Sequence, residues 1–310
     1  MCKIIGIGES ILDIVFQNNQ LQKAVPGGST FNCMISLARS GLPATFITEL
    51  GNDRTGRLIQ SFMQENGLST EHIYIFDDGK TPVSMAFLDK NRNAEYVFYS
   101  DFPEKRLDIR FPAINAGDVV VFGSYFAVNP GLRDKMGDFL RYAQSQKALL
   151  YYDINFRKAH ASERAELIPV FIENFAFADV IRCSDEDLAV LFPKQTISSI
   201  YNQYFLPQKK PLIITQGSNN IVLKTPNWET KYPVEAIIPV STIGAGDNFN
   251  AGWIYGFIQN QLKLEDLPFL SASQWESLMD YAQKFAREVC LSLENYISIH
   301  SSLDNPGKSI

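Results

Sequence analysis

One carboxylate stands at the start of a predicted helix, directly behind a glycine-rich turn. In PVSTIGAGDNFNAGWIYGF, residues 239–257, the end of an apolar strand pattern is followed by Gly244, Ala245, Gly246 and then Asp247. A helix N-terminus carries unpaired N–H groups and a partial positive charge, and glycine lets an anion approach the backbone closely. The stretch therefore predicts an anion hole for a transferring phosphoryl group, with Asp247 as the base or as the residue that orients the attacking hydroxyl. The competing interpretation makes Asp247 a simple helix cap and the glycines a plain turn.

Other catalytic motifs find little support in the sequence. A Walker A loop needs glycine five residues before Gly-Lys-Ser/Thr, and the two such segments have Tyr74 and Ser302 at that place. A dinucleotide fingerprint begins at the first predicted strand, but Ile11 stands where its third glycine belongs. No GxSxG or HExxH segment occurs, and the histidines are isolated. A nucleotide-cofactor oxidoreductase is thus a weaker alternative to a phosphoryl-transfer enzyme.

Composition limits the possible partners and the compartment. The 310 residues are 45% hydrophobic, which is ample for a large core, and their formal net charge is -6. No basic cluster is present to neutralise phosphates, so neither nucleic acid nor an anionic membrane is an expected partner. The 4 cysteines lack CxxC spacing, and no apolar stretch reaches the roughly 18 residues of a spanning helix. We therefore expect a reduced, soluble, cytoplasmic protein.

The elements that must position Asp247 are short apolar strands separated by helices. Unbroken apolar runs are typical of parallel strands covered on both faces, and their alternation with helices predicts a doubly wound α/β fold. The predicted strands occupy residues 3–8, 44–50, 118–123, 148–155, 179–184 and 211–215. Helical spacing of apolar residues predicts helices within 30–41, 56–68 and 130–147, the second with Leu58, Phe62 and Met63 on its apolar face.

Two segments interrupt this alternation with hairpin patterns. They are residues 11–26 and 82–101, and the second alternates around a polar turn at residues 89–93. Both fall between core elements, so we expect a small additional sheet that forms a lid at one edge. The sequence contains no repeat or linker, which predicts a single domain over residues 1–310.

Several motifs together resemble the ribokinase-like (PfkB) family of sugar and nucleoside kinases. Residues 239–257 are similar to the family's C-terminal signature, and PGGSTFNCMISLARSGLPATFITELGNDRTG to its N-terminal signature. GESILD, DINFR, SDED and TQGSNN occupy the places of its other sugar and nucleotide motifs. The resemblance implies a Rossmann-type three-layer α/β/α sandwich with a small β-sheet lid. It also implies ATP-dependent phosphorylation of a sugar hydroxyl, with Mg²⁺, and a homodimer formed through the lid.

The resemblance implies a role for each matching residue. The catalytic group comprises Asp247 as base, the N–H groups of Gly244, Ala245 and Gly246 as anion hole, and Arg157 near the transferring phosphate. The implied sugar contacts are Asp13, Gly28 and Asn32. The implied nucleotide contacts are Ser184, Thr215, Gly217, Gly246 and Gln283, and Mg²⁺ would be held through waters by Glu186 and Asp187. Structural alternatives stay open: Asp13 as a polar turn residue, Arg157 as a surface arginine, and the two acids as ordinary helix-start residues.

Departures from the family pattern are informative. Ser241 replaces an aspartate of a loop that binds a monovalent cation in many relatives, which puts potassium activation in doubt. Ser184 and Asp187 replace the Asn and Glu of an Asn-x-x-Glu motif, and Gln283 stands where relatives often have Asn near adenine. Because the base and the anion hole persist, we expect an active enzyme rather than a catalytically weak, sugar-responsive binding protein.

The substrate expected from the resemblance is fructose. DINFR and the lid ending EYVFYS are most similar to fructokinases and to 2-keto-3-deoxygluconate kinases, and ribokinase is a further alternative. A phosphofructokinase would need basic residues for a second phosphate, for which Lys23, Lys90, Arg92, Lys105 and Arg106 are candidates.

Overall fold

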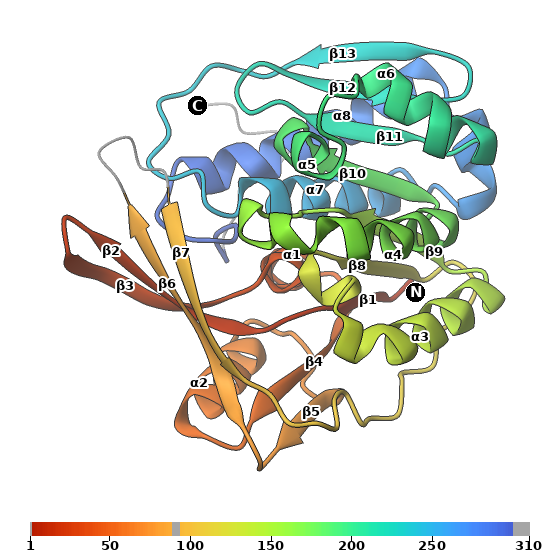
Figure 1. The fold of residues 1–310 in the computed structure, drawn as a ribbon. Helices are drawn as coiled ribbons and strands as arrows, with labels where there is room; N and C mark the ends of the chain where they lie inside the picture. The colour runs from red at the N-terminus through yellow and green to blue at the C-terminus, as the bar shows by residue number, and fades with distance from the viewer. Residues whose placement is uncertain (1, 89–93, 300–310) are drawn as a thin grey trace.

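The computed structural model describes residues 2–88 and 94–299, and a nine-stranded sheet forms the core of this part (Figure 1). The strands from β11 to β5 are parallel to their neighbours, and β12 and β13 are antiparallel at one edge. In spatial order they are β13 (Glu229–Pro233), β12 (Asn220–Lys224), β11 (Leu212–Thr215), β10 (Val180–Ser184), β9 (Leu149–Asp153), β8 (Val119–Gly123), β1 (Ile4–Ile7), β4 (Ala44–Gly51) and β5 (Ile73–Phe76). The predicted α/β sheet is therefore confirmed.

Helices cover both faces of this sheet, which explains why its strands are apolar without alternation. In β1, Ile4 packs into one hydrophobic cluster, whereas Ile5 and Ile7 pack into the other. The first cluster lies beneath α1 (Ser29–Arg39), α2 (Arg54–Glu65), α7 (Ala245–Gln259) and α8 (Ala272–Cys290). The second lies beneath α3 (Arg133–Ser145), α4 (Arg164–Phe177), α5 (Asp185–Leu191) and α6 (Ile197–Ile200). None of the helices within residues 2–88 and 94–299 has the length and apolar character to cross a bilayer.

A separate four-stranded sheet forms beside the core. Its strands, in spatial order, are β3 (Gln20–Gly27), β2 (Ile11–Gln17), β6 (Lys80–Leu88) and β7 (Ala94–Asp101). The pairs β2–β3 and β6–β7 are antiparallel hairpins, as predicted, and β2 joins them by pairing in parallel with β6. Figure 1 shows this sheet, hereafter the lid, projecting on the left of the core. The predicted polar turn at 89–93, with Lys90 and Arg92, lies outside the described residues.

Some expectations about the elements were incomplete or wrong. Strands β5, β12 and β13 were not predicted, and the apolar strand expected before the glycine turn is irregular chain that includes Ile238, 92% exposed. In α2 the buried stripe contains Ile59 and Met63, whereas Leu58 is 47% exposed. The predicted face is therefore right for Met63 and for Phe62, which packs against the core, and wrong for Leu58, whose place is taken by the neighbouring Ile59.

Candidate active site

Asp247 lies in the first turn of α7, but its side chain bonds to α1 instead of capping its own helix. Gly244 is the N-cap residue of α7 and has no side chain to cap it. The Asp247 carboxylate accepts hydrogen bonds from Ser29 Oγ and Asn32 Nδ2, each at 2.8 Å. Ser29 and Asn32 are three residues apart at the start of α1, so both face the same side of that helix. The start of α1 thus fixes the orientation of the carboxylate.

The environment of Asp247 makes its carboxylate more basic than an exposed one. The side chain is buried, and burial raises the pKa of Asp247, because a charged carboxylate loses solvation. Hydrogen bonds from Asn32 and Ser29, and the positive charges of Arg157 and Arg182, lower the pKa and partly offset that rise. A desolvated carboxylate with a raised pKa, held in one orientation, is suited to accept a proton.

The glycine turn ahead of Asp247 is shaped by two close contacts. Gly244 adopts φ 79, and a Cβ there would lie 2.7 Å from the carbonyl oxygen of Asn295. A Cβ on Gly246 would lie 2.9 Å from both terminal nitrogens of Arg182. The N–H of Ala245 donates to Thr242 O at 3.3 Å, so it is partly engaged within the turn. Helix geometry leaves the next N–H groups, those of Gly246 and Asp247, without an intrahelical acceptor. The anion hole at Gly244, Ala245 and Gly246 stays a prediction.

The predicted sugar contacts meet where the lid joins the core. Asp13 lies on β2 and accepts a hydrogen bond from Ser84 Oγ of β6. Burial raises the pKa of Asp13 to about 6, and the negative charge of Asp247 contributes to that rise. The neighbouring hairpin strand leads directly into Gly28, the N-cap of α1, and then to Asn32. Asp13, Gly28, Asn32 and Asp247 therefore line one region, between lid and α7.

The residues predicted to contact the nucleotide lie at or just beyond the carboxyl ends of two strands and on helix α8. Ser184 ends β10 and caps α5, and Thr215 ends β11. Gly217 follows with φ 56 in the next turn, and Gln283 is half-buried on α8. Arg182 Nη2 donates to Thr215 Oγ1 at 2.6 Å, which fixes the threonine hydroxyl.

The predicted magnesium ligands differ sharply in environment. Asp187 is buried, and its two oxygens accept backbone hydrogen bonds from Phe156 N at 2.9 Å and Ser184 N at 2.7 Å. Ser184 and Asp187 thus form a capping box, which explains why this Ser–Asp pair is compatible with a helix start. Glu186 is exposed. Within the described part of the chain, no cluster of three or more His, Cys, Asp or Glu side chains could hold a metal, so these residues do not fit a ready-made Mg²⁺ site.

Two residues near Asp247 escaped the sequence interpretation. Ser29 hydrogen-bonds the carboxylate, and Arg182 contacts the glycine turn. Arg182 left a signal in the sequence, because it is a charged residue inside the otherwise apolar strand segment DVIRCS. Ser29 left a weaker one, since it precedes Asn32 by the three residues that place two side chains on one helix face.

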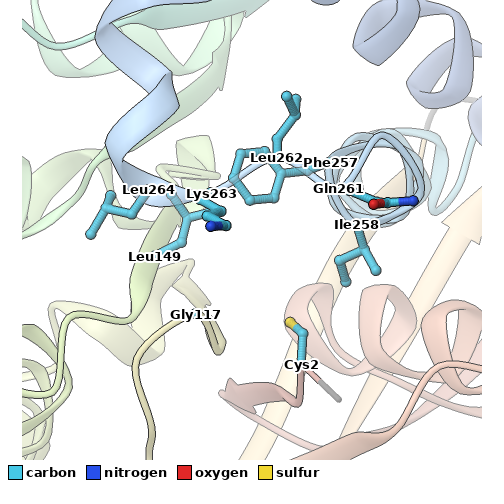
Figure 2. A pocket seen from close by; sticks show the side chains of 9 residues that line it. All are labelled: Cys2, Gly117, Leu149, Phe257, Ile258, Gln261, Leu262, Lys263 and Leu264. Atoms are coloured by element: carbon cyan, nitrogen blue, oxygen red, sulfur yellow. The ribbon is translucent and has the colours of Figure 1, made fainter.

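A separate cavity lies at the amino ends of the central strands β1, β8 and β9. Figure 2 shows Cys2, Gly117 and Leu149, which lie next to the amino ends of core strands, together with residues at the C-terminal end of α7. The cavity measures about 200 Å³ and is lined mainly by apolar atoms. Because Asp247 is at the other end of α7, this cavity is separate from the candidate active site.

Known proteins share both the sequence pattern and the architecture. The pattern of the pfkB family carbohydrate kinases matches residues 7–298. Fructokinase-1 of Oryza sativa subsp. japonica is 25% identical over 276 residues, covering 85% of both chains. A double mutant of Vibrio cholerae O395 fructokinase, solved in a fructose-, ADP- and potassium-bound form, has TM-score 0.82 and 20% identity, covering 96% of this chain and 95% of that one. Salmonella enterica aminoimidazole riboside kinase, complexed with aminoimidazole riboside and an ATP analogue, has TM-score 0.78 and 20% identity, covering 96% of both chains.

Proposed function

This chain belongs to the pfkB family of carbohydrate kinases, and from that premise we propose that it transfers the γ-phosphoryl group of ATP to a hydroxyl of fructose. The observation that carries the proposal is the buried Asp247 carboxylate, which Ser29 and Asn32 of α1 orient at the N-terminus of α7. Relatives named fructokinase, at 22% to 25% identity over most of the chain, support fructose as the substrate.

In the proposed reaction, each residue acts on one part of the transfer. Asp247 orients the sugar hydroxyl and accepts its proton as the oxygen attacks the γ-phosphorus. The turn from Gly244 to Gly246 stabilises the negative charge on the transferring phosphoryl group through its N–H groups, and Arg157 adds a positive charge. Asp13 and Gly28 hold the sugar, whereas Asn32, already bonded to Asp247, both orients the base and approaches the sugar.

The nucleotide is proposed to lie along Ser184, Thr215, Gly217 and Gln283. This assignment is supported by the carboxyl-end position of β10 and β11, where ligands bind in open α/β sheets. Water-mediated contact of Mg²⁺ with Glu186 and Asp187 stays a prediction.

A second phosphate on the sugar is disfavoured by the contacts of Lys23, Lys105 and Arg106, the candidate basic residues within the described ranges. Lys23 Nζ donates to Leu293 O and to Asn295 Oδ1. Arg106 is paired with Glu49, and Lys105 with Asp108 at 2.5 Å. We therefore place fructose ahead of fructose 6-phosphate. 2-Keto-3-deoxygluconate and ribose are the alternative acceptors, and ADP release measured with each sugar separates all four.

The decisive variant is Asp247→Asn, which keeps the size of the side chain and removes its charge. We expect kcat to fall at least about a hundredfold, because base removal typically costs about 10² to 10⁴ in rate. KM for ATP should change only a few-fold, and the melting temperature should stay within a few degrees of wild type, because an amide can still accept one bond from α1.

Asp134→Asn is the matched control, since Asp134 is an exposed acid in the first turn of α3. This variant should retain wild-type kcat. Near wild-type turnover by Asp247→Asn would show that the carboxylate is not the base. A wild-type protein that binds sugar but releases no ADP would instead favour the sugar-responsive binding protein.

The lid supplies the surface that we propose for a homodimer. Leu21, Val97 and Tyr99 are exposed on its two edge strands, at 61%, 39% and 57%. Exposed apolar side chains on edge strands favour association with another sheet. Sedimentation equilibrium should give twice the chain mass, and a monomer at every concentration would exclude the dimer.

A further inference from the structure

Strands β8, β9, β10 and β11 end beneath the candidate active site and are called its floor hereafter. Arg182 is a buried cation in this floor. It lies on β10 with 6% of its surface exposed, between neighbouring strands on both sides. Nη1 is 3.1 Å from Asp153 Oδ1 at the end of β9, and Nη2 is 2.6 Å from Thr215 Oγ1 at the end of β11. The guanidinium therefore links the carboxyl ends of three adjacent strands.

The same guanidinium contacts the glycine turn from inside the protein. Both terminal nitrogens would lie 2.9 Å from a Cβ on Gly246, so a side chain at this position would have to displace the guanidinium. Its Cζ atom is 5.8 Å from the ring centre of Phe249, one turn further along α7. Arg182 Nε is buried and has no hydrogen-bond partner among the described residues. The charge thus lies directly behind the anion-binding end of α7.

Fold stability alone does not explain a cation at this position. Replacing a buried ion pair by apolar residues of similar volume is often neutral or stabilising, because desolvation costs about as much as the pairing returns. The partner carboxylate of Asp153 is held on its other oxygen by Asn250 Nδ2 at 2.8 Å. Asp153 and Arg182 therefore form a dipole whose positive end faces the glycine turn.

We propose that Arg182 is a positioning residue for phosphoryl transfer, which packs beneath Gly246 and places a fixed positive charge behind the turn that receives the γ-phosphoryl group. This inference rests on the proposed kinase function. A fixed charge in a water-poor site stabilises developing negative charge without reorganisation during the reaction. The other charged or titratable groups that act on Asp247 are Arg157, Asp13, Asp153 and Cys33.

The test compares charge removal with charge retention at position 182. Arg182→Met leaves Asp153 unpaired, so the double variant Arg182→Met with Asp153→Asn provides a neutral pair that can fold if the single variant cannot. Arg182→Lys keeps the charge. Arg133→Met is the matched control, because Arg133 is another largely buried arginine, paired with Glu173 on the helix layer away from the turn.

Turnover and binding are both measured. We expect the neutral double variant to lose about thirtyfold or more in kcat with KM for sugar changed less than about threefold, and Arg182→Lys to retain kcat within about tenfold. By calorimetry the double variant should bind ATP about tenfold more weakly while its affinity for ADP, which lacks the γ-phosphate, changes little. Arg133→Met should match wild type in all of these.

Three results would overturn the proposal. They are an unchanged kcat in the double variant, an equal kcat loss in Arg182→Lys and the double variant, or equal losses of ATP and ADP affinity. Equal losses of ATP and ADP affinity would indicate that Arg182 has only a general structural role. Because the affinity ratio does not require turnover, the role of Arg182 is tested even if the wild-type protein phosphorylates none of the sugars, a result that would count only against the proposed function.

Discussion

The floor of the candidate site and the lid differ in how far their strands are buried. All residues of β8 and β9 in the floor are buried, whereas β3 of the lid is largely exposed along its outer half. In the floor, Arg182 and Asp153 are buried and bonded to each other. The polar contacts of the lid lie instead at its base. A buried, internally paired floor suits a phosphoryl group, whose position must not vary, and a lid that is more exposed suits a sugar that must enter and leave.

Polar contacts join the lid to the core at Thr81 of β6, which bonds to Asp53 and Gly51, and at β3. Lys23 of β3 donates to Leu293 O and, at 3.0 Å, to Asn295 Oδ1, both in the segment after α8. Tyr296 OH donates to Pro26 O at 2.7 Å near the same place. Asn295 O in turn accepts from Asn248 Nδ2 of α7 at 2.8 Å. The segment after α8 therefore connects the lid to the helix that carries Asp247.

The largest effect within this comparison is expected from Lys23→Met, which removes one lid attachment without touching the floor. We expect KM for the sugar to rise about tenfold while kcat changes less than about threefold, because a hydrogen bond to a charged group contributes on the order of 1.5–3 kcal/mol and Lys23 is only partly buried. Hydrogen exchange in residues 11–26 should become faster in the sugar-bound protein.

Lys135→Met is the control, since Lys135 is a half-exposed lysine on α3 that is 3.9 Å from Asp108. This variant should leave both KM for the sugar and hydrogen exchange in residues 11–26 unchanged. A Lys23→Met variant with wild-type KM and wild-type hydrogen exchange would show that the lid does not depend on this contact.

A smaller effect is expected on the pH dependence of stability, through Glu9 in the connection between β1 and β2. Burial raises the pKa of Glu9 to about 7, helped by Glu49 and Asp13 and opposed by Arg106. Because the folded-state pKa lies above the ordinary value of 4.5, the native state favours the protonated acid. Ionisation of Glu9 therefore destabilises the folded protein. The contribution of Glu9 to the free energy of unfolding falls as the pH rises from about 4.5 to about 7, and it is constant above that range.

Glu9→Gln should abolish this pH-dependent loss. We expect the variant to melt a few degrees above wild type at pH 8, with the difference shrinking toward pH 5. Glu65→Gln, at an exposed position that ends α2, provides the control and should follow wild type at both pH values. Parallel melting curves for Glu9→Gln and wild type across this range would contradict the raised pKa.

The sequence predicted both regions by different signals. Unbroken apolar runs predicted the floor strands, since a strand covered on both faces cannot alternate. Alternation around turns predicted the lid hairpins. β13 was missed because its polar, alternating residues, such as Glu229 and Lys231, resemble a surface loop. The strand expected before the glycine turn was wrong, because Ile238 is apolar yet exposed.

The site was only partly predictable for a physical reason. Local helix-start chemistry indicated Asp247, because the dipole and the free N–H groups depend on near neighbours in the chain. Its contacts with Ser29 and Asn32 depend on how α1 and α7 approach each other, and spacing within one helix contains no information on that. The contact of Arg182 with Gly246 likewise joins residues 64 positions apart in the numbering (246 − 182).

The smallest effect is expected from potassium, and it tests whether the floor is complete in itself. Ser241 has no carboxylate, and its hydroxyl oxygen accepts a hydrogen bond from Ile243 N at 3.2 Å, so it is already used within its own turn. A neutral hydroxyl attracts a monovalent cation less strongly than a carboxylate does. We therefore expect rates in potassium and in tetramethylammonium, at equal ionic strength, to differ by less than about threefold. Ser241→Asp is the matched gain-of-function variant, and it should acquire a larger response to potassium because it adds a charge at the same position. A tenfold stimulation of the wild-type enzyme would mean that backbone carbonyls alone bind the ion, and the floor would then depend on a charge from solution as well as on Arg182.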